Sequence, residues 1–108
     1  GGCHGGLSRY ELHNFLSMSG AAFKARTALD VPAGNVDITP TVLHLLGLTA
    51  PPGLDGRVLH EAFDGGPQPD SLTWIDDIIA SPNPDGPTTY LSVTDLGTPR
   101  YINRAWAK

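Results

Sequence analysis

Cysteine, methionine and long apolar runs are scarce in this sequence. Its 108 residues include one cysteine, Cys3, and one methionine, Met18. A single cysteine excludes an internal disulfide. No run approaches the roughly 20 apolar residues of a transmembrane helix, so we expect no membrane span. Because Met18 lies inside an apolar segment and no methionine opens the sequence, we expect a processed product or a piece of a longer protein.

Positive charge is also sparse. The 7 Lys and Arg residues against 11 Asp and Glu give a net charge of -4, and the basic residues are scattered. Without a basic stripe to neutralise phosphates, a nucleic-acid duplex is not an expected partner. Glycine and proline, with 13 and 10 residues, stay below the level of low-complexity chains. We expect one loop-rich unit over residues 1–108 that buries roughly two-thirds of its unfolded surface.

The stretch from Gly34 to Leu48 predicts a buried helix at about 37–46. Pro40 is tolerated in a first turn, where its missing N–H has no helical partner, and Gly47 supplies the end. Asp37 or Thr39 can cap the start. Apolar residues at helical spacing cover most of the helix surface and leave a narrow polar edge. The apolar residues are Ile38, Val42, Leu43, Leu45 and Leu46, and the polar ones are Asp37, Thr41 and His44. We therefore expect this helix to anchor the core.

The segments on either side of this helix are less regular. Residues 15–19 predict a short interior strand that ends at Gly20. Residues 21–29 fit a short helix or an irregular excursion equally well. Residues 58–63 predict one or two helical turns, and the glycine- and proline-rich residues 64–70 predict a linker.

The last third of the sequence has a β-rich composition. Residues 71–80, 88–94 and 98–106 are rich in β-branched and aromatic side chains and are separated by turn-forming sequences. They predict an antiparallel β meander over 71–106, joined by the linker to residues 1–63. The expected fold class is α/β, or α+β for the isolated fragment.

The histidines are the candidate metal ligands, and none pairs at the i, i+4 spacing that places two on one helix face. They are His4, His13, His44 and His60. Glycines around His4 let backbone approach a ligand closely, although an ordinary chain terminus explains the same composition. We expect His44 to be a hydrogen-bonded structural residue, and His13 and His60 to lie on the surface. No self-contained metal site is predicted.

Other kinds of site find less support. The segment from Gly6 to Tyr10 lacks the second glycine and the preceding strand of a nucleophile elbow. Asp76 and Asp77 would point to opposite faces of a strand, so we expect a solvated edge rather than a shared proton or cation. Four aromatic residues offer a ligand platform, but their strand spacing is typical of cross-strand packing. These are Trp74, Tyr90, Tyr101 and Trp106. No catalytic residue is assigned.

An ordered succession of short motifs resembles one protein family. The motifs are Gly2-Cys3-His4-Gly5, Ser19-Gly20 with Phe23-Lys24, Gly34-Asn35-Val36-Asp37-Ile38-Thr39-Pro40-Thr41-Val42-Leu43, Leu45-Leu46-Gly47-Leu48, and Leu54-Asp55-Gly56-Arg57-Val58-Leu59. Over about residues 2–63 the chain resembles the C-terminal part of the alkaline phosphatase superfamily, in the branch of type I phosphodiesterases, nucleotide pyrophosphatases and sulfatase-like hydrolases. The resemblance implies the C-terminal part of an alkaline-phosphatase-like fold.

The resemblance also implies a chemistry. The family hydrolyses phosphate or sulfate esters beside divalent metal, commonly a pair of zinc ions in the phosphodiesterase branch. Its Gly-x-His-Gly motif carries a metal-binding histidine, which His4 matches. Neutral imidazole is a good zinc donor, and the flanking glycines leave room for a cation. Cys3 does not stand at the family's nucleophile position.

The family's other catalytic residues have no counterpart in this sequence. The nucleophile, an early aspartate ligand and the Asp-His-Gly ligands lie upstream in the family, and this sequence has no Asp-His dipeptide. The resemblance therefore implies an inactive fragment whose partners are the missing N-terminal part of the same domain and a small phosphate- or sulfate-ester substrate. Apolar surface exposed by separation from that part favours self-association. The alternative is a stand-alone binding or accessory module that uses the aromatic β meander.

Overall fold

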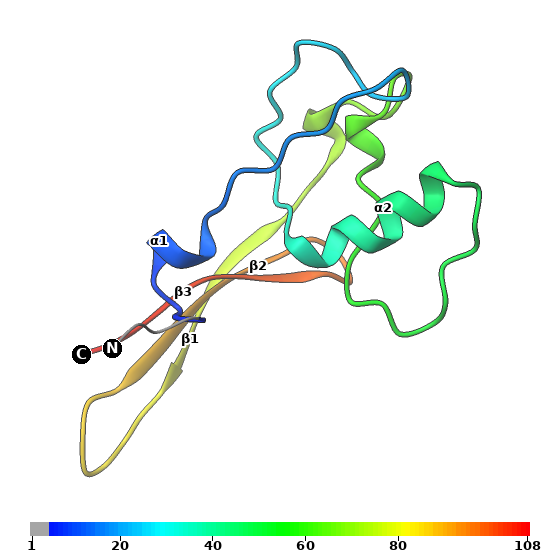
Figure 1. Cartoon of the computed structure of the whole chain (residues 1–108). Helices are drawn as coiled ribbons and strands as arrows, with labels where there is room; N and C mark the ends of the chain where they lie inside the picture. The colour runs from blue at the N-terminus through cyan, green and yellow to red at the C-terminus, as the bar shows by residue number, and fades with distance from the viewer. Residues whose placement is uncertain (1–4) are drawn as a thin grey trace.

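Three antiparallel strands form the largest element of the computed structural model, which describes residues 5–108. β1 spans Ile75–Ser81, β2 spans Thr89–Asp95 and β3 spans Arg100–Ala107, in the spatial order β1-β2-β3 (Figure 1). The chain is thus a small mixed α/β unit with a short helix and a three-stranded antiparallel sheet. The predicted β meander is confirmed.

Local sequence explains the hairpins of this sheet. The tight turn between β2 and β3 contains Gly97, whose φ of 65° is costly for other residues, and the Leu96 N–H donates to the Pro99 carbonyl at 3.0 Å. Ser92 pairs with Arg104 and Val93 with Ile102, so Asn103 is left unpaired and marks a bulge in β3. Along β2, burial is greatest at Val93 and Thr94. This end of the sheet is therefore the covered one.

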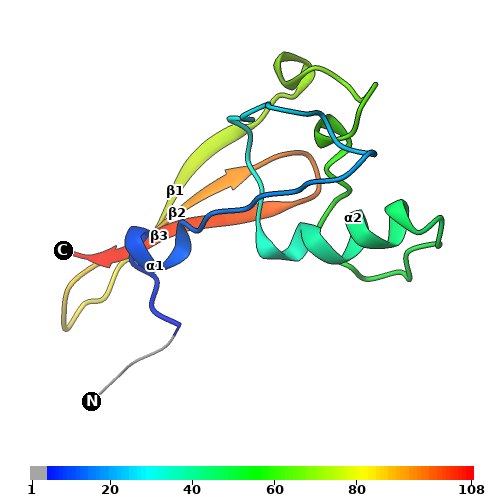
Figure 2. The same ribbon diagram turned by 45° about the horizontal axis from the view of Figure 1, so that its top comes forward.

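A single longer helix lies beside that covered end (Figures 1 and 2). The 3-10 helix η1 (Asn35–Asp37) leads into α2 (Ile38–Leu45). α2 ends at Leu45, two residues before Gly47, whose φ is 68°, and the Leu48 N–H donates to the Leu43 carbonyl at 2.9 Å. This pattern is a glycine helix cap. The position and the end of the predicted helix are confirmed.

The predicted burial of this helix is wrong. In α2 the buried residues are Pro40 and Thr41, whereas Val42 is 45% exposed and Ile38 and Leu45 are similarly exposed. Asp37, which precedes the helix, is fully buried. Asp37 and Thr41 of the polar edge therefore face the rest of the chain, whereas His44 and the apolar stripe are exposed. Periodicity shows that a helix has two faces, but it does not show which face the chain covers.

The other helical elements are short. They are α1 (Arg9–Leu12), η2 (His60–Ala62) and η3 (Pro69–Ser71). η2 is the single turn observed within the predicted helical residues 58–63, and η3 begins at the end of the predicted linker. Among the residues that the structure describes, none of the helices has the length and apolar character that a membrane crossing requires.

The segment before η1 lacks the regular structure predicted for its first part. Residues 15–19 form no strand, and Phe15 is 91% exposed. Residues 21–29 follow the irregular alternative. In this segment Phe23 forms an isolated antiparallel β-bridge with Phe63, and the two rings lie 5.0 Å apart. With no neighbouring strand to pair with, the apolar residues of 15–19 cannot form an interior strand.

The overall shape is open. The radius of gyration is 16.6 Å, against about 13 Å for a compact chain of this length. The accessible surface is 7949 Å², against about 5,800 Å² for a compact monomer of this mass. The chain consequently buries only about half of its unfolded surface, less than the predicted two-thirds. The excess of about 2,000 Å² of total accessible surface is of the size buried in a protein interface.

Candidate functional site

His4, the predicted metal ligand, lies outside the described residues. Within residues 5–108, no group of three or more His, Cys, Asp or Glu side chains is arranged to hold a metal ion. The described part of the chain therefore does not fit a pair of zinc ions by itself. The sites that the structure does build are a buried polar cluster, a histidine-lined pocket and an apolar groove.

The buried polar cluster connects α2 to the sheet through Asp37. One Asp37 oxygen, Oδ2, accepts the Gly34 N–H at 2.8 Å, which closes the turn that opens η1. The other oxygen, Oδ1, accepts the Arg57 N–H at 2.8 Å and the Tyr101 hydroxyl at 3.3 Å. A fully buried carboxylate is tolerated only with such a set of donors. Asp37 thus joins three segments that are distant in sequence.

Arg57 completes this cluster, and its side chain is held on three sides. Its guanidinium donates two hydrogen bonds to Glu61, at 2.6 and 2.8 Å, and one to the Pro32 carbonyl at 3.0 Å. Its Nε donates to the Tyr101 hydroxyl at 3.2 Å. Among the described residues, no buried side-chain nitrogen or oxygen lacks a hydrogen-bond partner. We call Asp37, Arg57, Glu61 and Tyr101 the polar junction.

The pKa values in the polar junction are shifted by burial and by pairing. Burial disfavours the charged Arg57 side chain, but its hydrogen bonds to Glu61 and the charge of Glu61 outweigh this effect and raise the pKa of Arg57. Burial also disfavours the Glu61 carboxylate, yet the hydrogen bonds from Arg57 lower its pKa. Burial raises the pKa of Tyr101 to about 12, against the opposing hydrogen bond from Arg57. Within the junction, Arg57 and Glu61 therefore form an ion pair beside the neutral Tyr101 phenol at neutral pH.

Two of the motifs that carry the family resemblance meet at this junction. A Cβ on Gly56 would lie 2.0 Å from the Val36 carbonyl oxygen, so only glycine fits there. The Thr41 hydroxyl accepts the Leu59 N–H at 3.1 Å and adds a second link. These motif residues hold the segments together and do not form a catalytic centre. Glu61 was not a predicted site residue, Arg57 was named only within a motif, and Tyr101 was predicted only for an aromatic platform. The Asp-Gly-Arg run of residues 55–57 was the available signal for the junction.

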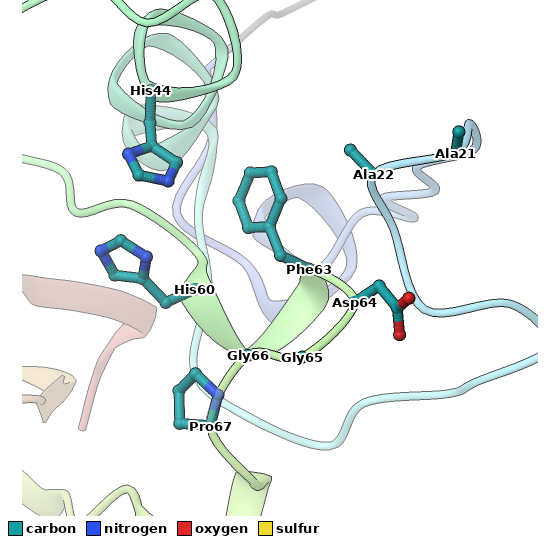
Figure 3. Close-up of a pocket in the computed structure, with 9 residues that line it drawn as sticks. All are labelled: Ala21, Ala22, His44, His60, Phe63, Asp64, Gly65, Gly66 and Pro67. Atoms are coloured by element: carbon teal, nitrogen blue, oxygen red, sulfur yellow. The ribbon is translucent and has the colours of Figure 1, made fainter.

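The histidine-lined pocket lies between α2 and η2 (Figure 3). The His44 and His60 rings are 4.8 Å apart and nearly perpendicular, and the Phe63 ring lies 5.3 Å from His44. The pocket measures about 640 Å³ and is completed by Ala21, Ala22, Asp64, Gly65, Gly66 and Pro67. His60 and His13 are exposed as predicted, and His44 is exposed as well, with its ring packed against His60 and Phe63.

The apolar groove, of about 260 Å³, runs along the outward face of α2. It lies between this helix and the irregular residues 16–23. Its apolar lining consists of Leu16, Met18, Phe23, Ile38, Val42, Leu45 and Leu59. The residues predicted as an interior strand thus form one wall of an open groove.

The remaining predicted candidates are separate from these sites. Asp76 accepts a hydrogen bond from Thr94, whereas Asp77 accepts its neighbour's N–H, so the two carboxylates have different partners. Tyr90 stacks on Trp106 across the strands with ring centres 5.3 Å apart. Tyr101 is buried in the polar junction and contributes nothing to an aromatic platform.

Comparison with known protein families, with curated proteins and with solved structures gives no match for this chain. Its function has to be inferred from its residues and their arrangement.

Proposed function

We propose that this chain is the C-terminal portion of a metal-dependent hydrolase of phosphate or sulfate esters, most closely phosphodiesterase- or nucleotide-pyrophosphatase-like, within the alkaline phosphatase superfamily. Its role in the parent enzyme is to contribute one metal ligand, His4, and structural support. The ordered motifs between residues 2 and 63 support this assignment, since they follow one another as in that family.

The observation that carries the proposal is the outward apolar face of α2. Ile38, Val42 and Leu45 of this helix are 42–45% exposed along an open groove, as expected of a face that lacks the element that would cover it. The chain also exposes about 2,000 Å² more surface than a compact monomer of its mass. A missing N-terminal part of the same domain, packed on this face, accounts for both features.

The residues of this chain indicate which parts of the catalytic site it supplies and which the missing part supplies. His4 offers one neutral imidazole to a metal ion, and zinc in the parent site would polarise the ester and activate a nucleophile. This chain supplies no cluster of three donors within residues 5–108 and no residue at the family's nucleophile position. The remaining ligands and the nucleophile belong to the missing part, so the 108-residue chain alone is inactive.

The polar junction has a supporting role in this proposal. It fixes the turn before α2, the Asp-Gly-Arg segment and β3 in one arrangement through hydrogen bonds of 2.6 to 3.3 Å. α2 therefore presents its apolar face at a fixed position relative to the sheet. In the parent enzyme this rigid support would hold the covering part, and the metal ligands that it carries, at a fixed position.

The test compares two proteins with a chromogenic phosphodiester and zinc. We expect turnover from the protein expressed from the full reading frame that contains this chain, and none from the 108-residue chain. His4→Ala in the longer protein should lower kcat/KM by at least about 100-fold, because even outer-shell partners of metal ligands are worth 10–100-fold. His13→Ala is the matched control and should retain activity.

Two results would overturn the proposal. One is metal-dependent turnover by the 108-residue chain that His4→Ala abolishes, because the chain would then be competent alone. The other is a reading frame that starts just before Gly1, which would favour the stand-alone binding module. In that case the stacked Tyr90 and Trp106 side chains, with Arg104 lying over the Trp106 ring, become its candidate surface.

A further inference from the structure

His44 and His60 come from different elements and meet at the mouth of one pocket. His44 lies in the last turn of α2 and His60 opens η2, sixteen positions later. Figure 3 shows the two imidazoles pointing toward each other, with Phe63 beside them. Both residues are exposed, so a dissolved ion can reach the ring nitrogens.

The separation of the two rings matches that of two ligands on one metal ion. Imidazoles bound tetrahedrally to zinc, with Zn–N bonds of about 2.0–2.1 Å, place their ring centres roughly 5 Å apart. The observed separation is 4.8 Å. A metal ion could therefore be bound by small side-chain rotations, without moving either backbone segment.

The backbone around the pair is already fixed. The Thr41 hydroxyl, one turn before His44 on α2, accepts the N–H of Leu59, the residue next to His60, at 3.1 Å. Gly66 lies against the His60 carbonyl so closely that a Cβ there would approach its oxygen to 2.0 Å. Pre-positioned ligands lose less conformational entropy on binding, which favours affinity.

We propose that His44 and His60 together bind one divalent transition-metal ion of the kind that prefers imidazole, such as Zn²⁺ or Ni²⁺. This proposal does not depend on the hydrolase assignment. The Asp64 carboxylate lines the same pocket but points away from the two rings (Figure 3). The protein thus supplies two donors, and water or a small anion in the pocket completes the coordination. The bound ion ties α2 to η2.

The experiment is a titration of the 108-residue chain with NiCl₂, followed by NMR of the histidine ring protons. Cys3→Ser and His4→Asn form the background, because they remove the other adjacent pair of metal donors. Paramagnetic Ni²⁺ should broaden the His44 and His60 signals together at substoichiometric metal, and leave the His13 signal sharp. Zinc should saturate at one ion per chain and raise the midpoint of thermal unfolding, since it binds the folded state.

Single variants distinguish one metal ion bound by both imidazoles from separate binding to each ring. His44→Asn or His60→Asn should each lower the affinity by roughly tenfold or more, because one imidazole of a bidentate pair is lost. His13→Asn is the matched control and should change nothing. Circular dichroism of each variant verifies that the exposed substitutions leave the fold intact.

Independent broadening of His44 and His60, or an affinity unchanged by either variant, would overturn the site. A rise in thermal midpoint that survives His44→Asn would do the same. The hydrolase proposal is unaffected by these results, because it is tested by turnover and by His4→Ala in the longer protein.

Discussion

The two sides of α2 are held in opposite ways. On the inward side, Asp37 and Thr41 are buried and each accepts hydrogen bonds from distant backbone. On the outward side, Ile38, Val42 and Leu45 line an open groove. In this chain the fully buried contacts of the helix are polar, while its aliphatic residues remain 42–45% exposed.

Magnitudes explain why this arrangement suits a part of a larger domain. A typical hydrogen bond contributes about 0.5–1.5 kcal/mol net, so the polar junction can hold α2 in place but gives little surplus stability. Burying a large aliphatic side chain contributes roughly 1.5–3 kcal/mol. Covering the three outward residues would therefore add several kcal/mol, which is a large share of the stability of a small domain.

The largest expected effect comes from breaking the inward side at Arg57. Arg57→Ala leaves the buried Glu61 carboxylate without its guanidinium donors, while the backbone N–H of residue 57 still reaches Asp37. Loss of one partner of a buried pair costs about 3–5 kcal/mol. Urea unfolding followed by tryptophan fluorescence measures this change. Arg100→Ala, which removes an exposed ion pair with Asp95, is the control, and should cost less than about 1 kcal/mol. An equal loss of unfolding free energy in the two variants would mean that the polar junction does not attach α2.

A second prediction concerns pH. Because the folded state raises the pKa of Tyr101 to about 12, it favours the neutral phenol. The stabilisation is complete below pH 10, the ordinary pKa of tyrosine, and is lost as the pH rises to about 12. The loss should reach about 2–3 kcal/mol. Urea midpoints between pH 8 and 12 measure it, and Tyr101→Phe should remove this component of the pH dependence; a profile identical in the variant would contradict the assignment.

The third prediction tests the close approach at Gly56. Gly56→Ala places a methyl group against the Val36 carbonyl oxygen and should destabilise the chain by about 1–3 kcal/mol. Gly86→Ala is matched, because its nearest neighbour is the movable end of the Asn83 side chain. The difference in urea midpoint between the two variants measures the effect. A neutral Gly56→Ala would show that the two motif segments are not in contact.

The smallest change in the free energy of unfolding is expected on the outward side of α2. Two single variants at adjacent positions test this. Thr41→Val deprives the Leu59 N–H of its acceptor and should cost about 1–3 kcal/mol. Val42→Thr changes an exposed position and should stay within about 0.5 kcal/mol. A helix buried by its apolar face would give the reverse order. Chemical unfolding of the pair at neutral pH distinguishes the two arrangements.

The sequence predicts those features that depend on neighbouring residues. Pro40 and Gly47 mark the start and the end of α2 through local backbone chemistry, and the β-branched runs mark the strands. The helix face that is covered could not be predicted, because its partners are distant: Tyr101 reaches Asp37 across 64 positions. The His44 and His60 pair was missed for the same reason, since only the fold brings the two elements together.

Accessibility of the outward face in two proteins tests the central claim most directly. Val42→Cys in a Cys3→Ser background can be labelled with a thiol reagent in the 108-residue chain and in the protein expressed from the full reading frame. We expect rapid labelling in the isolated chain and labelling slower by roughly tenfold or more in the longer protein, where local opening must expose the thiol. Equal labelling rates in the two proteins would contradict the account.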